Sequence, residues 1–343
     1  MSLEGPAAPP PRGSAGEPVL SVDRLSIRFR GAPATIVEDL SLTVSRGETL
    51  CIVGESGCGK SLTALALMGL LPPAAEITSG TADFLGTDLL GLSQAEMSEI
   101  RGDRMAMVFQ EPMTSLNPAF RIGDQIGEAV RRHRRVDAAA ARARALEMLE
   151  RVHIPAPEKR LDEYPHQLSG GMRQRAMIAM ALANDPALLI ADEPTTALDV
   201  TIQAQILALV RTLQEETGAT LILITHDLGV VAEVADQVAV MYAGHIVESG
   251  PVDRIFTDPQ HPYTIGLMSS IPSVHGRSGR LVTIPGMVPT IETMPKGCRF
   301  STRCPFVEDA CLGAPPQLAE VAPGHAAACI NVPLEAKIKA DAA

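Results

Sequence analysis

The sequence predicts an α/β protein with a mainly parallel core sheet, an antiparallel strand layer before it, a helical subdomain within it and a small irregular domain after it. Three observations predict this fold class. Short, wholly apolar runs alternate with helix-like segments, a glycine-rich loop follows the first such run, and the alternation stops near residue 255, where prolines and glycines multiply. Buried parallel strands are continuous apolar runs, and the alternating helices cover the faces of their sheet.

Taken in order, the elements begin after residues 1–18, which are rich in proline, glycine and alanine and lack the apolar segment of a signal peptide. We expect a disordered lead-in there. The short runs LSIRF and LSLTV, within about residues 19–44, predict the antiparallel layer. A predominantly helical pattern over about residues 111–185 predicts the subdomain. Four later apolar runs are too short for surface helices and predict buried strands at residues 50–53, 105–109, 187–191 and 220–225.

Composition limits the classes of function. The chain has 343 residues, and no apolar stretch reaches the roughly 18 to 20 residues that a membrane-spanning helix needs, so we expect a soluble, cytosolic protein. A formal charge of −11 disfavours a protein that binds nucleic acid mainly through its phosphates. A reducing cytosol disfavours disulfides, so four cysteines crowded into the last fifth of the chain indicate a metal site.

The segment GESGCGKS has the spacing of a phosphate-binding loop. Its glycines let successive N–H groups turn toward phosphate oxygens, and the helix that follows adds the positive end of its dipole. Lys60 supplies a charge for the β- and γ-phosphates, and the Ser61 hydroxyl is a Mg²⁺ ligand. The N–H dipoles and Lys60 also favour a thiolate at Cys58, for which the alternative is a small loop filler. The predicted nucleotide-binding residues of the loop are Gly54, Glu55, Ser56, Gly57, Cys58, Gly59, Lys60 and Ser61.

The apolar run ALLIA ends in two acids that suit phosphoryl transfer to water. Asp192 can hold Mg²⁺ through water, and Glu193 can polarise an attacking water molecule. By itself this pattern is weak, because a solvated strand end has the same composition. Together with the phosphate-binding loop it predicts ATP hydrolysis.

The segment LSGGMRQR, residues 168–175, resembles the signature sequence of ABC-type ATPases, and the order of the other pieces is similar to that family. The resemblance implies that Gln110 senses Mg²⁺ and water, that Asp199 belongs to the D-loop, and that His226 contacts the γ-phosphate. It implies that Phe29 stacks on adenine, although a phenylalanine on a strand is often a core residue. Only about 58 residues separate Gln110 from the signature, which leaves no room for the long arm of DNA-repair and chromosome ATPases.

The signature implies a dimer. Ser169, Gly170 and Gly171 would offer a second group of N–H donors at a helix start, suited to a γ-phosphate. In the family this group comes from a partner subunit, so that two chains sandwich two ATP molecules. This chain has one loop and one signature, and we expect it to work as half of such a dimer.

Three segments resemble the ATPase subunits of oligopeptide and dipeptide importers, and the likeness covers about residues 19–332. They are FQEPMTSLNP, YPHQLSGGMRQRAMIAMAL and HPYTIGLMSSIP. The likeness implies a nucleotide-binding domain at 19–255, a C-terminal importer domain at 256–343, and a peripheral position on the cytoplasmic face of the inner membrane. It implies a second, different ATPase subunit, two membrane permeases and an extracytoplasmic substrate-binding protein as partners. A nickel importer is the alternative, and a DNA-repair or translation ATPase is a more distant one.

The tail holds Cys298, Cys304, Cys311 and Cys329, with five, six and seventeen residues between them. This spacing differs from the paired knuckles of structural zinc sites and leaves zinc and an iron–sulfur cluster open. The resemblance to peptide-importer ATPases implies a structural [4Fe–4S] cluster, with zinc, unligated thiols or disulfides as alternatives. At the start of the tail we expect His261 to form a His-Pro turn that packs the tail onto the preceding domain.

Overall fold

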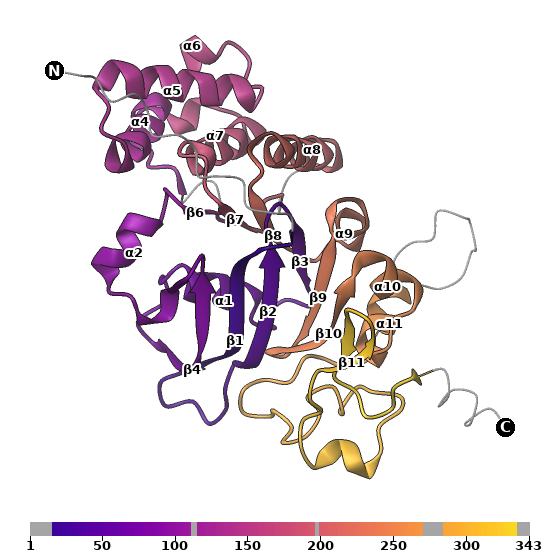
Figure 1. The fold of residues 1–343 in the computed structure, drawn as a ribbon. Coiled ribbons are helices and arrows are strands. Elements are labelled where there is room, and N and C mark those ends of the chain that lie inside the picture. Colours follow the sequence, from indigo (N-terminus) through magenta and orange to yellow (C-terminus); the bar gives the residue numbers. More distant parts are fainter. Residues whose placement is uncertain (1–15, 111–114, 196–198, 270–283, 335–343) are drawn as a thin grey trace. The chain divides into compact units, whose positions relative to one another are not determined.

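The structure, a computed structural model, describes residues 16–110, 115–195, 199–269 and 284–334. The chain forms two compact units, and Figure 1 labels their elements. The first unit holds mainly residues 95–221, and the second holds residues 20–43, 49–94 and the described residues from 222 onward. Most of the predicted lead-in lies outside the described residues, as do residues 111–114 at the start of the predicted helical segment.

The first unit packs helices around a pair of parallel strands. Strand β6 (Met105–Val108) pairs in parallel with β7 (Leu188–Asp192), and every residue of both strands is buried. Helix α4 packs against α5 and α7, and all three lie within the segment that was predicted to be helical. The helices and the 3-10 turn of this unit are α2 (Gln94–Ile100), α4 (Ile122–His133), α5 (Ala138–Arg151), α6 (Pro157–Arg160), η2 (Pro165–Gln167), α7 (Gly170–Leu182) and α8 (Val200–Thr217).

The second unit contains the expected strand layer near the start of the chain. Its four strands are ordered β2-β1-β4-β5. β1 and β4 are antiparallel, with Leu20 opposite Phe84. The last two strands follow the phosphate-binding loop in the chain and were not predicted, because their apolar residues form no continuous run. The bounds are β1 (Pro18–Phe29), β2 (Val37–Ser45), β4 (Ala75–Phe84) and β5 (Thr87–Asp88).

The parallel strand pair of the second unit joins β3 (Thr49–Val53) to β9 (Gln237–Tyr242). β9 pairs antiparallel with β10 (His245–Pro251), and β10 pairs antiparallel with β12 (His325–Ala327). The tail therefore adds strands to this sheet, ending in β11 (Ala319–Ala322). Strand β8 (Thr220–Thr225) is wholly buried. All four predicted buried strands are confirmed as β3, β6, β7 and β8.

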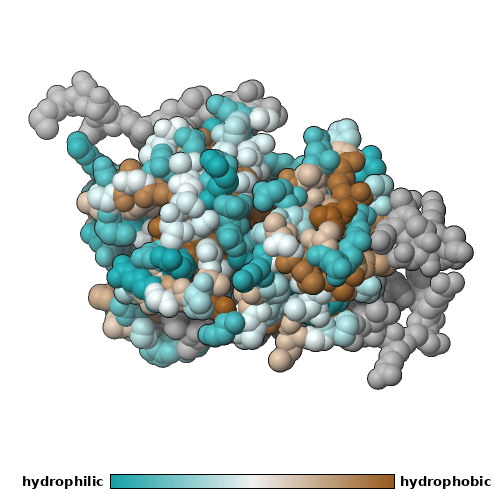
Figure 2. Space-filling model, turned by 90° about the horizontal axis from the view of Figure 1, so that it is seen from below, coloured by the Kyte–Doolittle hydropathy of each residue, from teal (hydrophilic) through white to brown (hydrophobic). Residues whose placement is uncertain are grey.

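Short helices and turns complete the second unit: α1 (Lys60–Leu67), η1 (Leu89–Gly91), α9 (Leu228–Val234), α10 (Val252–Thr257), α11 (Pro262–Ser269) and η3 (Asp309–Leu312). Within the described ranges, no helix combines the length and the apolar character needed to span a membrane. Figure 2 shows apolar and polar residues interspersed over the face in view. Several large apolar side chains exposed on the protein belong to the tail, namely Met287, Val307, Leu312, Leu318 and Ile330.

Candidate functional site

The phosphate-binding loop joins β3 to α1 and adopts a conformation that only glycine tolerates at two positions. Gly54 has φ +154°, and a Cβ there would lie 2.0 Å from the Met241 carbonyl oxygen on β9. Gly59 caps α1 with φ +104°, and a Cβ there would lie 2.9 Å from side-chain atoms of Met241 and Val37. The close approach of the Met241 carbonyl on β9 therefore requires glycine at position 54, and the left-handed backbone favours glycine at position 59. Ser56 and Gly57 are exposed, so the middle of the loop is accessible.

Lys60 is the first residue of α1 and is buried beneath the loop. Its ammonium donates to the carbonyl oxygens of Gly54, at 2.8 Å, and Glu55, at 3.0 Å. A third, longer contact reaches the Cys58 Sγ at 3.7 Å. These contacts keep the charged group within the curve of the loop. Ser61 follows on the same helix and is half-buried.

Of the two readings of Cys58, a thiolate and a small loop filler, the structure favours the loop filler. The Cys58 side chain is buried, and this burial raises the pKa of the thiol above its ordinary value, because a thiolate would lose its hydration. Lys60 opposes the shift but does not reverse it. Sequence reasoning counted the nearby positive charge and could not count the desolvation. The burial of Cys58 suits a small side chain that fills the inside of the loop.

Two other predicted nucleotide contacts lie in the second unit. Phe29 ends β1 and is half-buried, so it is not a closed core residue. His226 is exposed between β8 and α9. The next residue, Asp227, caps α9 by accepting from the Gly229 N–H at 2.9 Å. The cap fixes the backbone on which His226 is presented.

The first unit holds the predicted catalytic acids. Asp192 is the buried last residue of β7, and Glu193 follows it with φ +45°. A left-handed backbone at a non-glycine residue costs on the order of 1–3 kcal/mol and often marks a functional position. The Gln110 amide, two residues after β6, donates to the Glu193 carboxylate at 3.2 Å. The structure thus brings together the predicted glutamine and the predicted base.

The signature residues lie at the start of α7 in the first unit. Ser169 is the N-cap, and its hydroxyl accepts from the Met172 N–H at 3.3 Å. Ser169 and Gly170 are exposed, and Gly171 is half-buried. Asp199 is exposed and caps α8 by accepting from the Ile202 N–H at 3.0 Å. The other predicted residues of its segment, 196–198, lie outside the described residues.

Two residues near the phosphate-binding loop were not predicted. The Tyr263 hydroxyl accepts from the Glu55 N–H at 2.9 Å, and the Arg303 guanidinium donates to the Glu55 carboxylate at 2.9 Å. They lie 208 and 248 positions from Glu55 along the chain. Tyr263 falls within the segment HPYTIGLMSSIP, whose resemblance to peptide-importer ATPases was the one sequence signal that could have pointed to it. No pattern in the sequence relates Arg303 to the loop.

The beginning of the tail is anchored at Glu248 of β10, a fully buried carboxylate. It accepts from the backbone N–H groups of Gln260, at 2.7 Å, and His261, at 2.8 Å, and it contacts the His325 Nε2 at 2.7 Å. His261 is buried and its Nδ1 accepts from the Tyr263 N–H at 3.1 Å. The expected packing role of His261 is confirmed.

The four tail cysteines are free thiols. The Cys298 N–H donates to the Cys311 carbonyl at 2.8 Å, and each of the four thiols interacts electrostatically with the other three. Burial is the main cause that raises the pKa of Cys304 to about 11, and its neighbouring thiols add to the shift. Within the described ranges, no three His, Cys, Asp or Glu side chains are arranged to hold a metal ion. The described arrangement is therefore not that of a formed cluster or zinc site.

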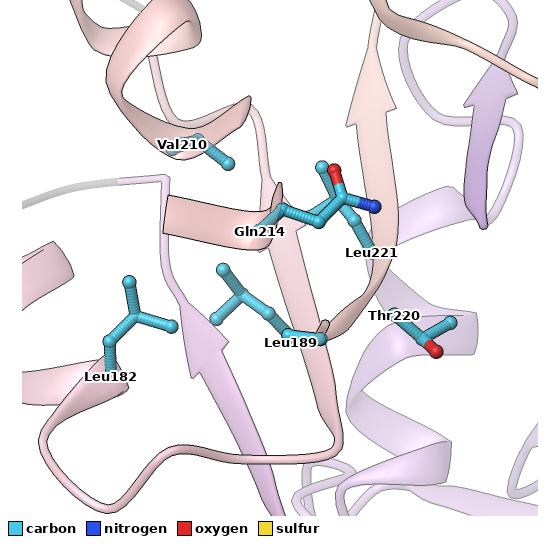
Figure 3. A pocket seen from close by; sticks show the side chains of 7 residues that line it. Leu182, Leu189, Val210, Gln214, Thr220 and Leu221 are labelled. Carbon is cyan, nitrogen blue, oxygen red and sulfur yellow. The ribbon is translucent and has the colours of Figure 1, made fainter. Parts of the chain in front are cut away.

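The pocket in Figure 3 belongs to the first unit and is a packing defect rather than a reaction site. Leu182, Leu189, Val210 and Leu221 line it from several elements, together with Gln214 and Thr220. Neither polar residue is an acid, a base or a nucleophile suited to phosphoryl transfer. The candidate chemistry lies on the loop and on the acids described above.

Comparisons with known proteins match both parts of the chain. The family described as "ABC transporter" matches residues 37–196, and the family described as "Oligopeptide/dipeptide transporter, C-terminal region" matches residues 247–311. A protein of Sinorhizobium fredii named "Probable peptide ABC transporter ATP-binding protein" is 54% identical over 315 residues, which cover 91% of this chain and 94% of that protein. The oligopeptide transport ATP-binding protein of Mycobacterium bovis is 50% identical over 92% of this chain, which spans only 52% of that longer relative.

Solved structures of ATP-binding cassettes are also similar to this chain. A dimeric ATP-binding cassette bound to ADP and phosphate has a TM-score of 0.61 and 27% identity, covering 68% of this chain and 98% of that chain. A Clostridium perfringens subunit of an ABC transporter complex has a TM-score of 0.61 and 26% identity, covering 73% of this chain and 95% of that chain. The predicted fold class is confirmed.

Proposed function

Because the chain belongs to the ABC transporter family of ATP-binding proteins, we propose that it is the ATP-hydrolysing subunit that powers the import of di- or oligopeptides through a membrane permease. The observation that carries this proposal is the joint match of the cassette and of the tail. The ATPase half is common to many transporters, whereas the matched tail region is described for oligopeptide and dipeptide transporters. The curated relatives described above are named for peptides, which favours peptides over nickel as the cargo.

In the proposed mechanism the loop residues hold the phosphates. The N–H groups around Ser56 and Gly57 would bind phosphate oxygens, and Ser61 with Asp192 would hold Mg²⁺, which neutralises charge on the phosphates. Lys60 would exchange its longest contact, the one to the Cys58 Sγ, for a phosphate oxygen. The loop thus needs little rearrangement to receive the nucleotide.

The hydrolytic step would use the Glu193 carboxylate and the Gln110 amide, both in the first unit. Glu193 would take a proton from the attacking water, and Gln110, which already donates to the Glu193 carboxylate, would orient that water. The left-handed backbone of Glu193 supports this role, because strain is kept where geometry matters. His226 would contact the γ-phosphate and Phe29 would stack on the adenine, and the exposed or half-buried state of both side chains supports this.

The proposed active form is a dimer of ATPase subunits on the cytoplasmic face of the inner membrane, bound to two permeases that receive peptide from a substrate-binding protein. The exposed start of α7 supports the dimer, because Ser169 and Gly170 are open to a partner's nucleotide. Asp199 would lie in the same contact. Residues 19–255 would form the nucleotide-binding domain, and residues 256–343 the importer-specific domain.

We also propose that Cys298, Cys304, Cys311 and Cys329 hold a structural [4Fe–4S] cluster, with zinc as the alternative. The mutual interaction of the four thiols supports this, although their described arrangement is not that of a formed metal site. Four thiolates suit either metal group. Anaerobically purified protein should then contain about four iron and four sulfide per chain. Protein with no iron and four freely titratable thiols would refute the cluster, and one zinc per chain would select the alternative.

The function is tested with the chain co-purified with its permeases and reconstituted in vesicles. Glu193→Gln should retain ATP binding and lose roughly 10²-fold or more of ATP hydrolysis, because a positioned base contributes about that much. Peptide uptake should fall with it. Glu215→Gln, an exposed change on α8, is the matched control and should hydrolyse ATP as the wild type does. Hydrolysis by Glu193→Gln at the wild-type rate would contradict the assignment of the base, and ATP-driven uptake of nickel without peptide would contradict the cargo.

A further inference from the structure

Three contacts converge on Glu55, the second residue of the phosphate-binding loop, and two of them come from the C-terminal tail. The Tyr263 hydroxyl accepts from the Glu55 backbone N–H at 2.9 Å, and the Arg303 guanidinium donates to the Glu55 carboxylate at 2.9 Å. The Lys60 ammonium donates to the Glu55 carbonyl oxygen at 3.0 Å. The N–H, the carbonyl and the side chain of one loop residue are therefore all fixed, two of them by residues that the loop motif does not contain.

The tail residues that reach Glu55 are themselves held rigidly. The Arg303 side chain is 4% exposed and donates also to the carbonyl oxygens of Pro285, at 2.8 Å, and Ile284, at 3.2 Å. Its guanidinium lies 5.7 Å from the centroid of the Tyr242 ring, at the end of β9. An arginine fixed by several carbonyls and a ring loses little further freedom when it pairs with a carboxylate.

Tyr263 lies in a buried aromatic cluster that joins α11 to the tail, in the part of the second unit drawn in orange and yellow in Figure 1. Its ring centroid is 4.6 Å from that of Tyr242 and 5.5 Å from that of Phe300. Tyr242 and Phe300 are 5.1 Å apart, edge to face. These separations are those of favourable ring pairs, so the hydroxyl of Tyr263 has a fixed position.

The carboxylate of Glu55 poses an electrostatic problem for a loop that binds phosphates. A negative side chain beside a polyanion is repelled, and the repulsion is stronger where protein excludes water. Arg303 places a compensating charge on that carboxylate and turns it toward the tail. Tyr263 fixes the peptide plane between Gly54 and Glu55, where the loop begins to curl.

We propose that Arg303 and Tyr263 are positioning residues for the nucleotide: Arg303 neutralises the Glu55 carboxylate, and Tyr263 holds the Glu55 backbone in the conformation that receives phosphate. The proposal rests on the proposed ATPase function. The tail then sets the affinity of the phosphate-binding loop for MgATP in addition to any contact it makes with other subunits.

The test measures binding of MgATP, by displacement of a fluorescent ATP analogue, to the full chain. Arg303→Ala should weaken binding about tenfold, because the Glu55 charge is then uncompensated. Adding Glu55→Gln to Arg303→Ala should restore affinity to within about threefold of the wild type, an effect that simple loosening of the tail cannot produce. Arg303→Lys, which keeps the charge, should bind within about threefold of the wild type. Tyr263→Phe should weaken binding about threefold to tenfold through loss of one hydrogen bond.

Arg299→Ala is the matched control. Arg299 lies in the same tail segment and its side chain is equally buried, but it donates to the Ala243 carbonyl and to the Glu38 carboxylate rather than to the loop. Arg299→Ala should bind MgATP within about threefold of the wild type. Equal losses in Arg299→Ala and Arg303→Ala, or no rescue by Glu55→Gln, would overturn the proposal. Failure of the wild type itself to bind MgATP would instead refute the proposed function, and the two failures are thus separable.

Discussion

Replacement of Glu248 by glutamine should release the start of the tail, because one buried carboxylate there accepts from three donors. The Glu248 Oε1 accepts from the Gln260 N–H and contacts the His325 Nε2, both at 2.7 Å. The Glu248 Oε2 accepts from the His261 N–H at 2.8 Å. Glu248 and His325 have no exposed side-chain surface. A glutamine has almost the same shape but only one acceptor oxygen.

The magnitude follows from the count of donors. The less costly orientation of Glu248→Gln keeps the oxygen at Oε1, with two partners, and places the NH₂ group at Oε2, facing the His261 N–H. Two buried donors then face each other, and each costs about 1–3 kcal/mol when unsatisfied. Glutamine is uncharged, so the variant avoids the cost of burying a charge, and this offsets part of the loss. We expect the local free energy of opening to fall by about 3 kcal/mol.

Amide hydrogen exchange measures this opening directly. A fall of about 3 kcal/mol corresponds to amide exchange roughly 10²-fold faster at Gln260 and His261. The His261 N–H loses its acceptor oxygen in the variant, and the Gln260 N–H shares the remaining oxygen with His325. Glu320→Gln is the control, because Glu320 is exposed on β11 and its carboxylate accepts from the Gly324 N–H at 3.0 Å. It should change exchange by no more than about twofold. Unchanged exchange in Glu248→Gln, or an equal change in the control, would refute the reasoning.

Three other predictions test different features. Burial lowers the pKa of His261 to about 3, below the roughly 6.5 of an unfolded histidine, so the unfolded chain binds the extra proton between these values. The contribution of His261 to the free energy of unfolding should be complete above pH 6.5 and should fall as the pH drops below that, by up to about 2 kcal/mol at pH 5. Urea titrations should show a shallower fall of the free energy of unfolding in His261→Gln than in the wild type. Equal falls in the two proteins would contradict this assignment. Cys58, buried and with a raised pKa, should react with maleimide at least tenfold more slowly in the native chain than after unfolding, as mass spectrometry can show, and equal rates would indicate an open thiol. Ser169→Arg should abolish ATP hydrolysis while its own binding of the ATP analogue persists, and loss of that binding would contradict the proposed dimer.

The local parts of the candidate site could be predicted from the sequence because their chemistry is contiguous. A loop that wraps phosphate needs its glycines, Lys60 and Ser61 within one turn of chain, and buried strands such as β3 and β8 need unbroken apolar runs. The match of the cassette and tail to known families follows from the same contiguous segments. Strands β9 and β10 were missed, although most of their residues are buried. The sequence of β10 carries glutamate, glycine and proline beside the apolar residues, whereas β9 is an unbroken run, VAVMY after Gln237, that the sequence prediction overlooked.

Only the tertiary structure decided which distant residues act on that loop. Arg303 and Tyr263 meet Glu55 across more than two hundred positions, and periodicity along a chain reports which face is buried but not what covers it. The choice between the two readings of Cys58 was likewise decided by the tertiary structure. Its neighbours in sequence suggest a thiolate, whereas its pKa depends on the removal of water by residues packed from elsewhere in the fold, and desolvation outweighs the single charge of Lys60. The sequence by itself determined the phosphate-binding motif, and folding determined the electrostatic surroundings in which that motif works.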